Sequence, residues 1–163
     1  MIGVPSSQGG IYDGESVVTG DTNTGKPVAS AAATNVGNTL CTSGSFSGTQ
    51  CGGVAVAVDQ TINMGGYGQV TDMVRAEKSN GFTMVGNGDS GGPVFFNTGE
   101  DNSWAIARGT VSAIPGDSDD WGACHGVPAG PDDDENARHC SWRFWYPDIT
   151  VQLAGVNATI RTL

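Results

Sequence analysis

The chain contains the string Gly88-Asp89-Ser90-Gly91-Gly92-Pro93, which leads at once into the apolar residues 94–96. Glycines on both sides of a serine let the backbone turn sharply and approach a substrate closely. A serine hydroxyl becomes a good nucleophile only when a base takes its proton and fixed donors receive the charge that develops on the substrate oxygen. The backbone amides of Gly88 and Ser90 can converge on one such oxygen. The string therefore predicts a nucleophilic Ser90 in a tight loop that returns directly into a core strand.

The segments on either side of this loop have the pattern of an all-β domain. Valine occupies every second position near the start of residues 53–62, which is typical of a strand. Further strands are predicted at residues 39–42, 69–76, 93–96 and 104–114. The chain has 26 glycines and only 15% charged residues, a composition that favours short strands and tight turns over helices. Together these features predict a β-barrel or a β-sandwich.

The two ends of the chain and its late acidic stretch are less regular. Residues 1–38 are rich in turn-forming residues and contain one short predicted strand at residues 16–19. Residues 115–140 predict a polar, acidic loop. The apolar tail at residues 148–163 fits either a short helix or a strand.

Composition and charge limit the partners that this chain could have. Its 163 residues suit one domain with a modest core. Lys and Arg total 7 against 17 Asp and Glu, so the formal net charge is −10, and we expect neither a nucleic-acid nor a membrane partner. No run of about 18 apolar residues is present to span a bilayer. The first residues also lack the pattern of a signal peptide, so an export signal would lie upstream of Met1.

The four cysteines fall into two pairs along the chain, Cys41 with Cys51 and Cys124 with Cys140. Each pair brackets a loop of small or polar residues, which favours two local disulfides formed in an oxidising compartment. A zinc site is the alternative for the second pair, because its cysteines adjoin His125 and His139.

The central string also fits the G-x-S-x-G nucleophile elbow of α/β-hydrolases. In that interpretation the chain order Ser90, Asp134, His139 completes a triad. The elbow requires a helix directly after the serine, whereas residues 91–96 make a poor first helical turn and a good strand. No alternation of strands and helices surrounds the string either. An α/β-hydrolase-type esterase is therefore the less favoured alternative.

Three motifs, in order along residues 39–114, resemble the chymotrypsin/trypsin-type serine proteases, in particular the secreted bacterial branch that includes α-lytic protease and the streptogrisins. Residues 88–93 match the nucleophile motif of that family. Residues 41–52 look like the branch's Ser-Gly…Thr-Gly loop, with the same cysteine spacing. Residues 108–113 resemble the Gly-x-x-Ser strand along which the substrate backbone pairs.

This resemblance implies an all-β fold, namely the second (C-terminal) six-stranded Greek-key barrel of a two-barrel protease, with a short C-terminal helix. Residues 39–163 would form the barrel, and residues 1–38 a loop-rich segment between the two barrels. The implied activity is that of a secreted serine endopeptidase, which hydrolyses polypeptides through an acyl-enzyme on Ser90 and needs neither a metal nor a cofactor. Its implied partner is the first β-barrel of the same protease, which this chain does not contain.

The resemblance also implies roles for individual residues. Ser90 would be the nucleophile, in an oxyanion hole formed by Gly88, Asp89 and Ser90, with the amides of Gly88 and Ser90 as donors. The implied substrate-binding residues are Met84, Val85, Gly86, Asn87, Ser112, Ala113 and Ile114. Residues 112–114 would pair with the peptide. Met84 and Val85 would lie at the base of the specificity pocket, which then favours an apolar side chain over a basic one, and the bulky Ile114 would narrow it.

The chain departs from the family pattern in the residues that activate the serine. The family's catalytic His and Asp lie upstream, on the first barrel, the His in a string such as Thr-Ala-Ala-His-Cys, which this chain lacks. Both His125 and His139 follow Ser90 and are interpreted as loop residues. We therefore expect a fragment or a truncated gene product of a larger endopeptidase. The alternative is a short protein in which the barrel serves as a non-catalytic binding module.

A second departure concerns the aspartate of the central string. The bacterial branch often has an arginine after the first cysteine of the Ser-Gly loop, and this arginine pairs with the aspartate before the nucleophile. Thr42 occupies that position here. Asp89 therefore needs another partner, for which Arg75 and Arg108 are the candidates.

Overall fold

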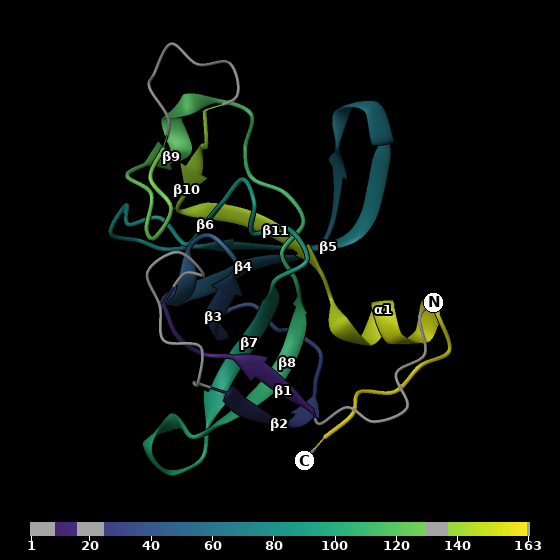
Figure 1. Cartoon of the computed structure of the whole chain (residues 1–163). Helices are drawn as coiled ribbons and strands as arrows, with labels where there is room; N and C mark the ends of the chain where they lie inside the picture. Colours follow the sequence, from purple (N-terminus) through teal and green to yellow (C-terminus); the bar gives the residue numbers. More distant parts are fainter. Residues whose placement is uncertain (1–8, 16–24, 130–136, 163) are drawn as a thin grey trace.

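The computed structural model describes residues 9–15, 25–129 and 137–162. The described chain consists mainly of strands, with three short 3-10 turns and one short helix near the C-terminus (Figure 1). The strand predicted at residues 16–19 and Asp134 of the alternative triad lie outside the described residues.

Six strands of the larger sheet form the barrel. In their order across the sheet they are β8 (Trp104–Thr110), β7 (Pro93–Thr98), β3 (Thr39–Gly44), β4 (Gly48–Asn63), β5 (Gln69–Glu77) and β11 (Arg143–Pro147). Bridges from Gly109 to Asp148 and from Ala113 to Trp145 join the two edge strands and close the barrel. The order β7-β3-β4-β5 is that of a Greek key, since the fourth strand returns to lie beside the first. The predicted all-β, six-stranded Greek-key barrel is confirmed.

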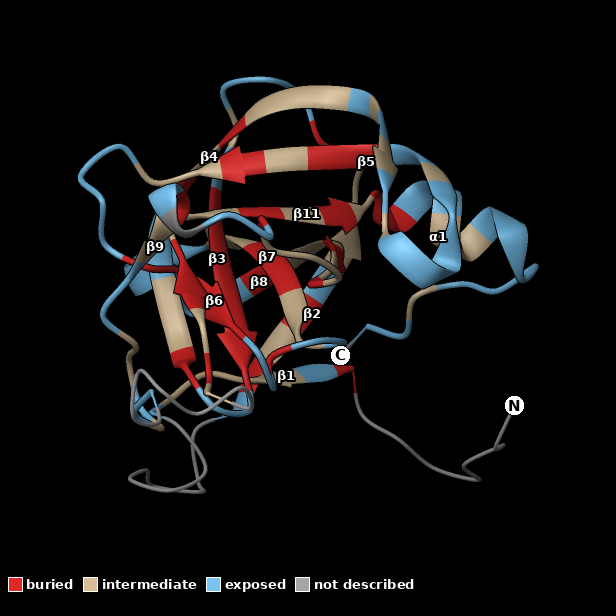
Figure 2. Ribbon diagram, turned by 90° about the horizontal axis from the view of Figure 1, so that it is seen from above, coloured by how far each residue is buried: buried red, intermediate tan, exposed pale blue. Residues whose placement is uncertain are grey.

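Apolar side chains from around the barrel fill its interior. Figure 2 shows the buried residues concentrated on the barrel strands and the exposed ones on the helix and loops. The main buried cluster consists of Leu40, Ala55, Val74, Ala76, Met84, Val85, Val94, Val111, Phe144 and Tyr146. Two small members lie side by side, because Ala76 of β5 pairs with Ala55 of β4, and Ala76 also pairs with the large Phe144 of β11. Small residues next to a large one let the side chains of the core pack without voids.

The structure places two strands in the segment that is predicted to be rich in loops. β2 (Gly25–Ala31) runs parallel to β8, and β1 (Gly10–Tyr12) pairs with β2. The buried Lys26 fixes them, because its Nζ lies 2.7 Å from a carboxylate oxygen of Asp13 and donates to Asn97 Oδ1 of β7 at 2.6 Å. The division of the chain at residue 38 stays a prediction.

The late acidic stretch is not a loop throughout, so this prediction is wrong in part. β9 (Trp121–Gly122), β10 (Cys140–Ser141) and β6 (Val85–Gly86) form a small second sheet in the order β6-β10-β9. Because β6 directly precedes the central string and β10 pairs with it, this sheet ties the acidic stretch to the Ser90 region. β11 is also not predicted from the sequence.

The C-terminal helix is confirmed as α1 (Ile149–Gly155). It begins at Asp148, whose side chain accepts a hydrogen bond from the Thr150 amide at 2.8 Å and so satisfies one of the free N–H groups of the first turn. No helix within the described part of the chain combines the length and the apolar character needed to cross a membrane.

The buried Tyr146 makes the stability of the barrel sensitive to alkaline pH. Its phenol is fully buried and donates to Thr34 Oγ1 at 3.1 Å. Burial raises the pKa of the Tyr146 phenol above its usual range, although the bond with Thr34 acts in the opposite direction. The neutral phenol therefore contributes stability below the pKa of about 10 that a tyrosine has in the unfolded chain. This contribution is lost as the pH rises above that value.

We predict that Tyr146→Phe weakens the decline of the unfolding free energy above about pH 10. At neutral pH the same substitution should cost about 1 kcal/mol, because one buried hydrogen bond is lost. Urea denaturation at pH 7 to 11 measures both effects. Tyr67, which is exposed, provides the control substitution Tyr67→Phe, and equal pH profiles for the two variants would contradict the prediction.

Candidate active site

The loop that carries Ser90, here called the Ser90 loop (residues 86–92), has a shape that depends on glycine. Gly88 has a φ of 94° and Gly91 a φ of 83°, both in the left-handed region that side chains rarely adopt. At Gly92 a Cβ atom would lie 2.7 Å from the Ser43 carbonyl oxygen, so β3 packs directly on this backbone. The amide of Gly92 donates to the Asp89 carbonyl at 2.9 Å and closes the turn around Ser90.

Ser90 is exposed at the tip of this turn. Within the described residues, neither its hydroxyl nor the amides of Gly88 and Ser90 make a hydrogen bond. Unpaired backbone amides beside a hydroxyl can receive the negative charge that develops when the hydroxyl attacks a carbonyl. The geometry is therefore suited to nucleophilic attack, provided that a base takes the hydroxyl proton.

A narrow cavity of about 70 Å³ adjoins Ser90. It brings together five of the predicted substrate-binding residues, and its lining is Gly86, Asn87, Ser90, Val111, Ser112, Ala113 and Ile114. The cavity shares Asn87, Ala113 and Ile114 with a wider cleft of about 510 Å³. The tip of the β4–β5 hairpin borders this cleft through Ile62, Met64 and Tyr67, and Trp145 also lines it. No residue of the small cavity is ionisable at neutral pH, so its lining is uncharged.

The backbone beside this cavity offers a free edge. Ala113 uses both its amide and its carbonyl in bonds to Trp145 of β11, at 3.1 and 2.8 Å. Within the described chain, the carbonyl of Ser112 and both backbone groups of Ile114 make no hydrogen bond. An extended peptide could therefore pair with these groups as an added strand.

Met84 and Val85 do not line the cavity. Both side chains are buried in the barrel core, and the Met84 carbonyl accepts a hydrogen bond from the Thr42 hydroxyl at 3.0 Å. The floor that the sequence assigns to these residues is thus part of the core, and their contact with a substrate stays a prediction.

The Asp89 carboxylate lies behind the Ser90 loop and is 1% exposed. Its Oδ1 accepts the amides of Phe46 and Ser47 at 2.9 and 2.8 Å. Its Oδ2 accepts the Ser47 hydroxyl at 2.5 Å and the Gly86 amide at 2.7 Å. A buried carboxylate is stable only when hydrogen bonds and an opposite charge replace its water. These bonds fasten the Ser90 loop to the turn between β3 and β4.

The opposite charge comes from Arg138, whose Nη2 lies 3.0 Å from Asp89 Oδ2. The two sequence-based candidates for this role are wrong. Arg75 pairs with Glu77 at 3.3 Å, and Arg108 donates to backbone carbonyls of residues 32 and 33. The sequence-based candidates did not include Arg138, for which the only signal was a lone arginine two residues before a cysteine in an acidic stretch.

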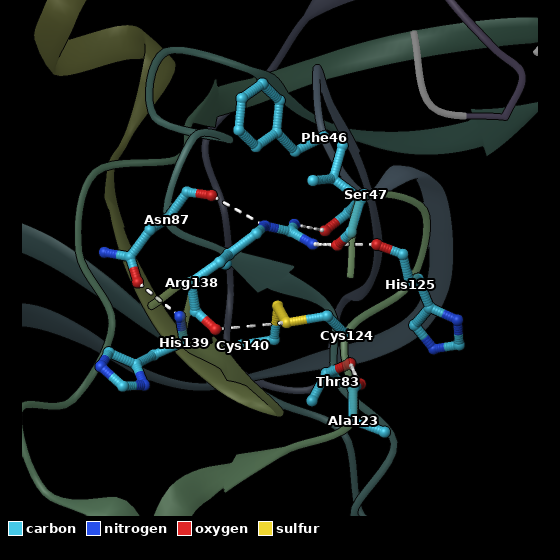
Figure 3. Close-up of a disulfide and its surroundings, with 12 residues drawn as sticks. Phe46, Ser47, Thr83, Asn87, Ala123, Cys124, His125, Arg138, His139 and Cys140 are labelled. Carbon is cyan, nitrogen blue, oxygen red and sulfur yellow. Dashed lines mark hydrogen bonds between the residues drawn. A yellow bond between two sulfur atoms is a disulfide. The ribbon is translucent and has the colours of Figure 1, made fainter. Parts of the chain in front are cut away.

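Figure 3 shows how Arg138 reaches the Ser90 region from beside the Cys124–Cys140 disulfide. Its Nε donates to the Asn87 carbonyl at 2.8 Å, and its Nη1 to the His125 carbonyl at 3.0 Å. Its guanidinium also lies over the Phe46 ring, 5.6 Å from the ring centre, and that ring covers Gly88. Arg138 thus contacts the Ser90 loop, residues 46–47 and residues 125–127.

Both predicted disulfides, Cys41–Cys51 and Cys124–Cys140, are present. The zinc alternative is therefore wrong, because the disulfide uses the thiol groups that would bind the metal. His139 stacks on Trp121 with ring centres 3.9 Å apart, and His125 lines a different cleft, so neither borders the cavity beside Ser90. The nucleophile-elbow alternative is also wrong, because a strand, β7, follows the serine where the elbow needs a helix.

Comparison with known proteins gives the class of this fold. No protein-family model and no curated protein matches the sequence. Among solved structures, the chain is similar to a glutamic acid specific serine protease that utilizes a histidine triad in substrate binding, with a TM-score of 0.60, 23% identity, and 95% of this chain and 61% of that chain covered. It is also similar to Nocardiopsis protease, with a TM-score of 0.55 and 22% identity, and the match covers 85% of this chain and 55% of that chain. Thermobifida fusca protease A is similar too, with a TM-score of 0.54 and 19% identity, and the match covers 86% of this chain and 57% of that chain.

The chain therefore has the fold of the bacterial chymotrypsin-like serine proteases. It spans about three fifths of the length of the glutamic acid specific protease, which agrees with one barrel of a two-barrel fold.

The Asp89 network predicts a large loss of stability when the carboxylate is neutralised. We expect Asp89→Asn to lower the unfolding free energy by about 3–5 kcal/mol, because it leaves Arg138 as an unpaired buried charge and turns an amide toward other donors. Urea denaturation measures the change. Asp119→Asn, on an exposed residue of the acidic stretch, is the control and should have little effect. A loss below about 1 kcal/mol for Asp89→Asn, the range of exposed pairs, would contradict the prediction.

Proposed function

We propose that this chain is the nucleophile-bearing barrel of a secreted serine endopeptidase. The observation that carries the proposal is the exposed Ser90 beside two unpaired amides, in a barrel with the fold of serine proteases. In the proposed reaction the Ser90 Oγ attacks the scissile carbonyl, a base takes its proton, and the amine leaves to give an acyl-enzyme. Water then releases the acid. The amides of Gly88 and Ser90 form the oxyanion hole.

The base and its orienting aspartate are proposed to lie on a first barrel outside this chain, with residues 39–163 as the second barrel and residues 1–38 leading into it. A second cleft of about 390 Å³, whose lining includes Tyr12, Ser43 and Ser90, leaves room beside the nucleophile for part of this first barrel and supports this arrangement.

The substrate is proposed to be a polypeptide with a small apolar side chain before the scissile bond. The cavity beside Ser90 is narrow and uncharged, and Ile114 lies at its border. The glutamic acid specific relative uses a histidine triad in substrate binding, but this chain has only two histidines and neither borders the cavity. Preference for an acidic side chain is therefore not part of the proposal. The two disulfides support an extracellular location.

A fluorophosphonate probe, which reacts with activated serines, tests whether Ser90 needs a base from outside this chain. We predict that the purified 163-residue chain reacts with the probe at a rate lower than a complete triad by a factor on the order of 10⁶, because the base is proposed to lie outside this chain. Labelling should become fast in a longer protein that supplies the first barrel, and should disappear in Ser90→Ala. Ser79→Ala, which alters a serine after the end of β5, is the matched control. Fast labelling of Ser90 in the chain alone would contradict the division of the site between two barrels.

The alternative is a non-catalytic module that binds peptides, favoured by the free backbone edge at Ser112 and Ile114. Calorimetric titration with apolar peptides separates the two. Binding that is as tight in Ser90→Ala as in the native chain, together with no labelling in the longer protein, supports the module. Labelling in the longer protein supports the protease.

A further inference from the structure

Arg138 and the Cys124–Cys140 disulfide join the same two backbone segments to each other, and Arg138 also holds them to the Ser90 loop. Arg138 lies two residues before Cys140, and His125 directly follows Cys124. The Arg138 Nη1 donates to the carbonyls of His125 and Val127, so the side chain repeats the link that the disulfide makes. The disulfide and the arginine therefore support each other.

The Arg138 side chain makes as many hydrogen bonds in this region as it has donors. A guanidinium has five N–H donors. Arg138 makes five hydrogen bonds, to the carbonyls of Asn87, His125 and Val127, to the Ser47 hydroxyl, and to Asp89 Oδ2. Only 6% of the side chain is exposed. Such a side chain cannot move without leaving several buried polar groups unpaired. Its hydrogen bonds are therefore expected to break together and not one at a time.

The backbone next to Arg138 also holds the Ser90 loop directly. His139 donates its amide to Asn87 Oδ1 at 2.8 Å and accepts the Asn87 amide at 3.0 Å. Cys140 pairs with Gly86, where a Cβ atom would come within 2.4 Å of the Cys140 sulfur. Two-residue strands such as β9 and β10 have few ladder bonds of their own, so the covalent link adds a constraint that these strands lack.

We propose that Arg138 is the positioning residue of the Ser90 loop and that the Cys124–Cys140 disulfide makes this positioning responsive to dithiol reductants. A dithiol reduces the disulfide through a mixed disulfide and closes to its own disulfide, so two electrons and two protons pass to the protein and two thiols form. The stretch from Cys124 to Val127 then loses its covalent link to the stretch that carries Arg138. The carbonyl contacts of Arg138 weaken, and Asp89 loses its fixed counter-charge.

The consequence for catalysis rests on the proposed function. With Asp89 no longer held, Gly88 and Ser90 no longer keep their amides at one point, and the site loses its oxyanion donors while the barrel stays folded. Reduction of a disulfide behind the site would thus inactivate the site without changing any residue that touches the substrate.

Hydrogen exchange of backbone amides tests the proposal without requiring any activity. The amides of Gly86, Asn87 and Asp89 are hydrogen-bonded and report on the order of the loop. We expect reduction of Cys124–Cys140, verified by alkylation and peptide mapping, to accelerate their exchange about tenfold or more, the effect of losing a charge-assisted hydrogen bond. The amides of β5 should exchange at an unchanged rate. No acceleration in the loop, or equal acceleration in β5, overturns the proposal.

Variants of Arg138 test whether arginine and disulfide act as one device. Arg138→Met should accelerate the same amides with the disulfide intact, and reduction should then add less than about twofold, because coupled groups are not additive. Arg138→Lys keeps a charge for Asp89 but cannot hold three carbonyls, so we expect partial protection that no longer responds to reduction. Independent, multiplicative effects of reduction and of Arg138→Met overturn the proposal.

Two matched controls separate this device from general loosening. Cys41→Ser with Cys51→Ser removes the other disulfide, and Arg143→Met removes an arginine that pairs with Glu77 and Asp120 away from the loop. Neither should accelerate exchange at Gly86, Asn87 or Asp89, and the same acceleration in either control overturns the proposal. Because the readout is exchange, a Ser90 that never reacts with a fluorophosphonate contradicts the proposed function and leaves this inference standing.

Discussion

The buried ion pair between Asp89 and Arg138 is the constraint on which the site depends. Asp89 directly precedes Ser90. The groups that hold the Asp89 carboxylate therefore also hold the backbone that carries the unpaired amides of Gly88 and Ser90. The carboxylate is held by donors from residues 46–47, from Gly86 and from Arg138, which are far apart in the sequence. A buried carboxylate with any of these missing would be costly, since desolvation of the charge would not be offset. The pair therefore couples the β3–β4 turn, the Ser90 loop and the late acidic stretch.

The sequence was sufficient for the features that short-range chemistry determines. The Ser90 turn follows from its glycines, several barrel strands from their apolar pattern, and the two disulfides from the spacing of neighbouring cysteines, whereas β1, β2, β9, β10 and β11 were not predicted. Arg138 lies 49 residues from Asp89, and its role depends on how β10 is placed against β6. Arg75, Arg108 and Arg138 carry the same charge, so nothing local in the sequence distinguishes them. Only the tertiary structure shows which one is buried beside Asp89.

The same limit applies to the side chains that fill the barrel. The valines of β4 give the strand its sequence pattern, yet they are half-buried, while Ala55 between them is fully buried. The interior of a small barrel accepts large residues from some strands only if others supply small ones, and here Phe144 and Tyr146 of β11 occupy that space. The floor assigned to Met84 and Val85 fails to line the cavity for a related reason. Both residues lie on the core side of the chain that enters the Ser90 loop.

A serine, two unpaired amides and a peptide-pairing edge form a site that is ordered before any base arrives. Preorganised donors contribute to catalysis because they need not move as charge develops, and the order of the donors proposed here comes from one barrel alone. The activation of the hydroxyl is a separate task, since within the described residues Ser90 has no partner for its proton. In the proposed two-barrel protease, the charge-stabilising half would therefore stay rigid, with its order set from behind by Arg138. The proposed chemistry then depends on two independent conditions, a docked base at the front of Ser90 and a fixed Arg138 at its back.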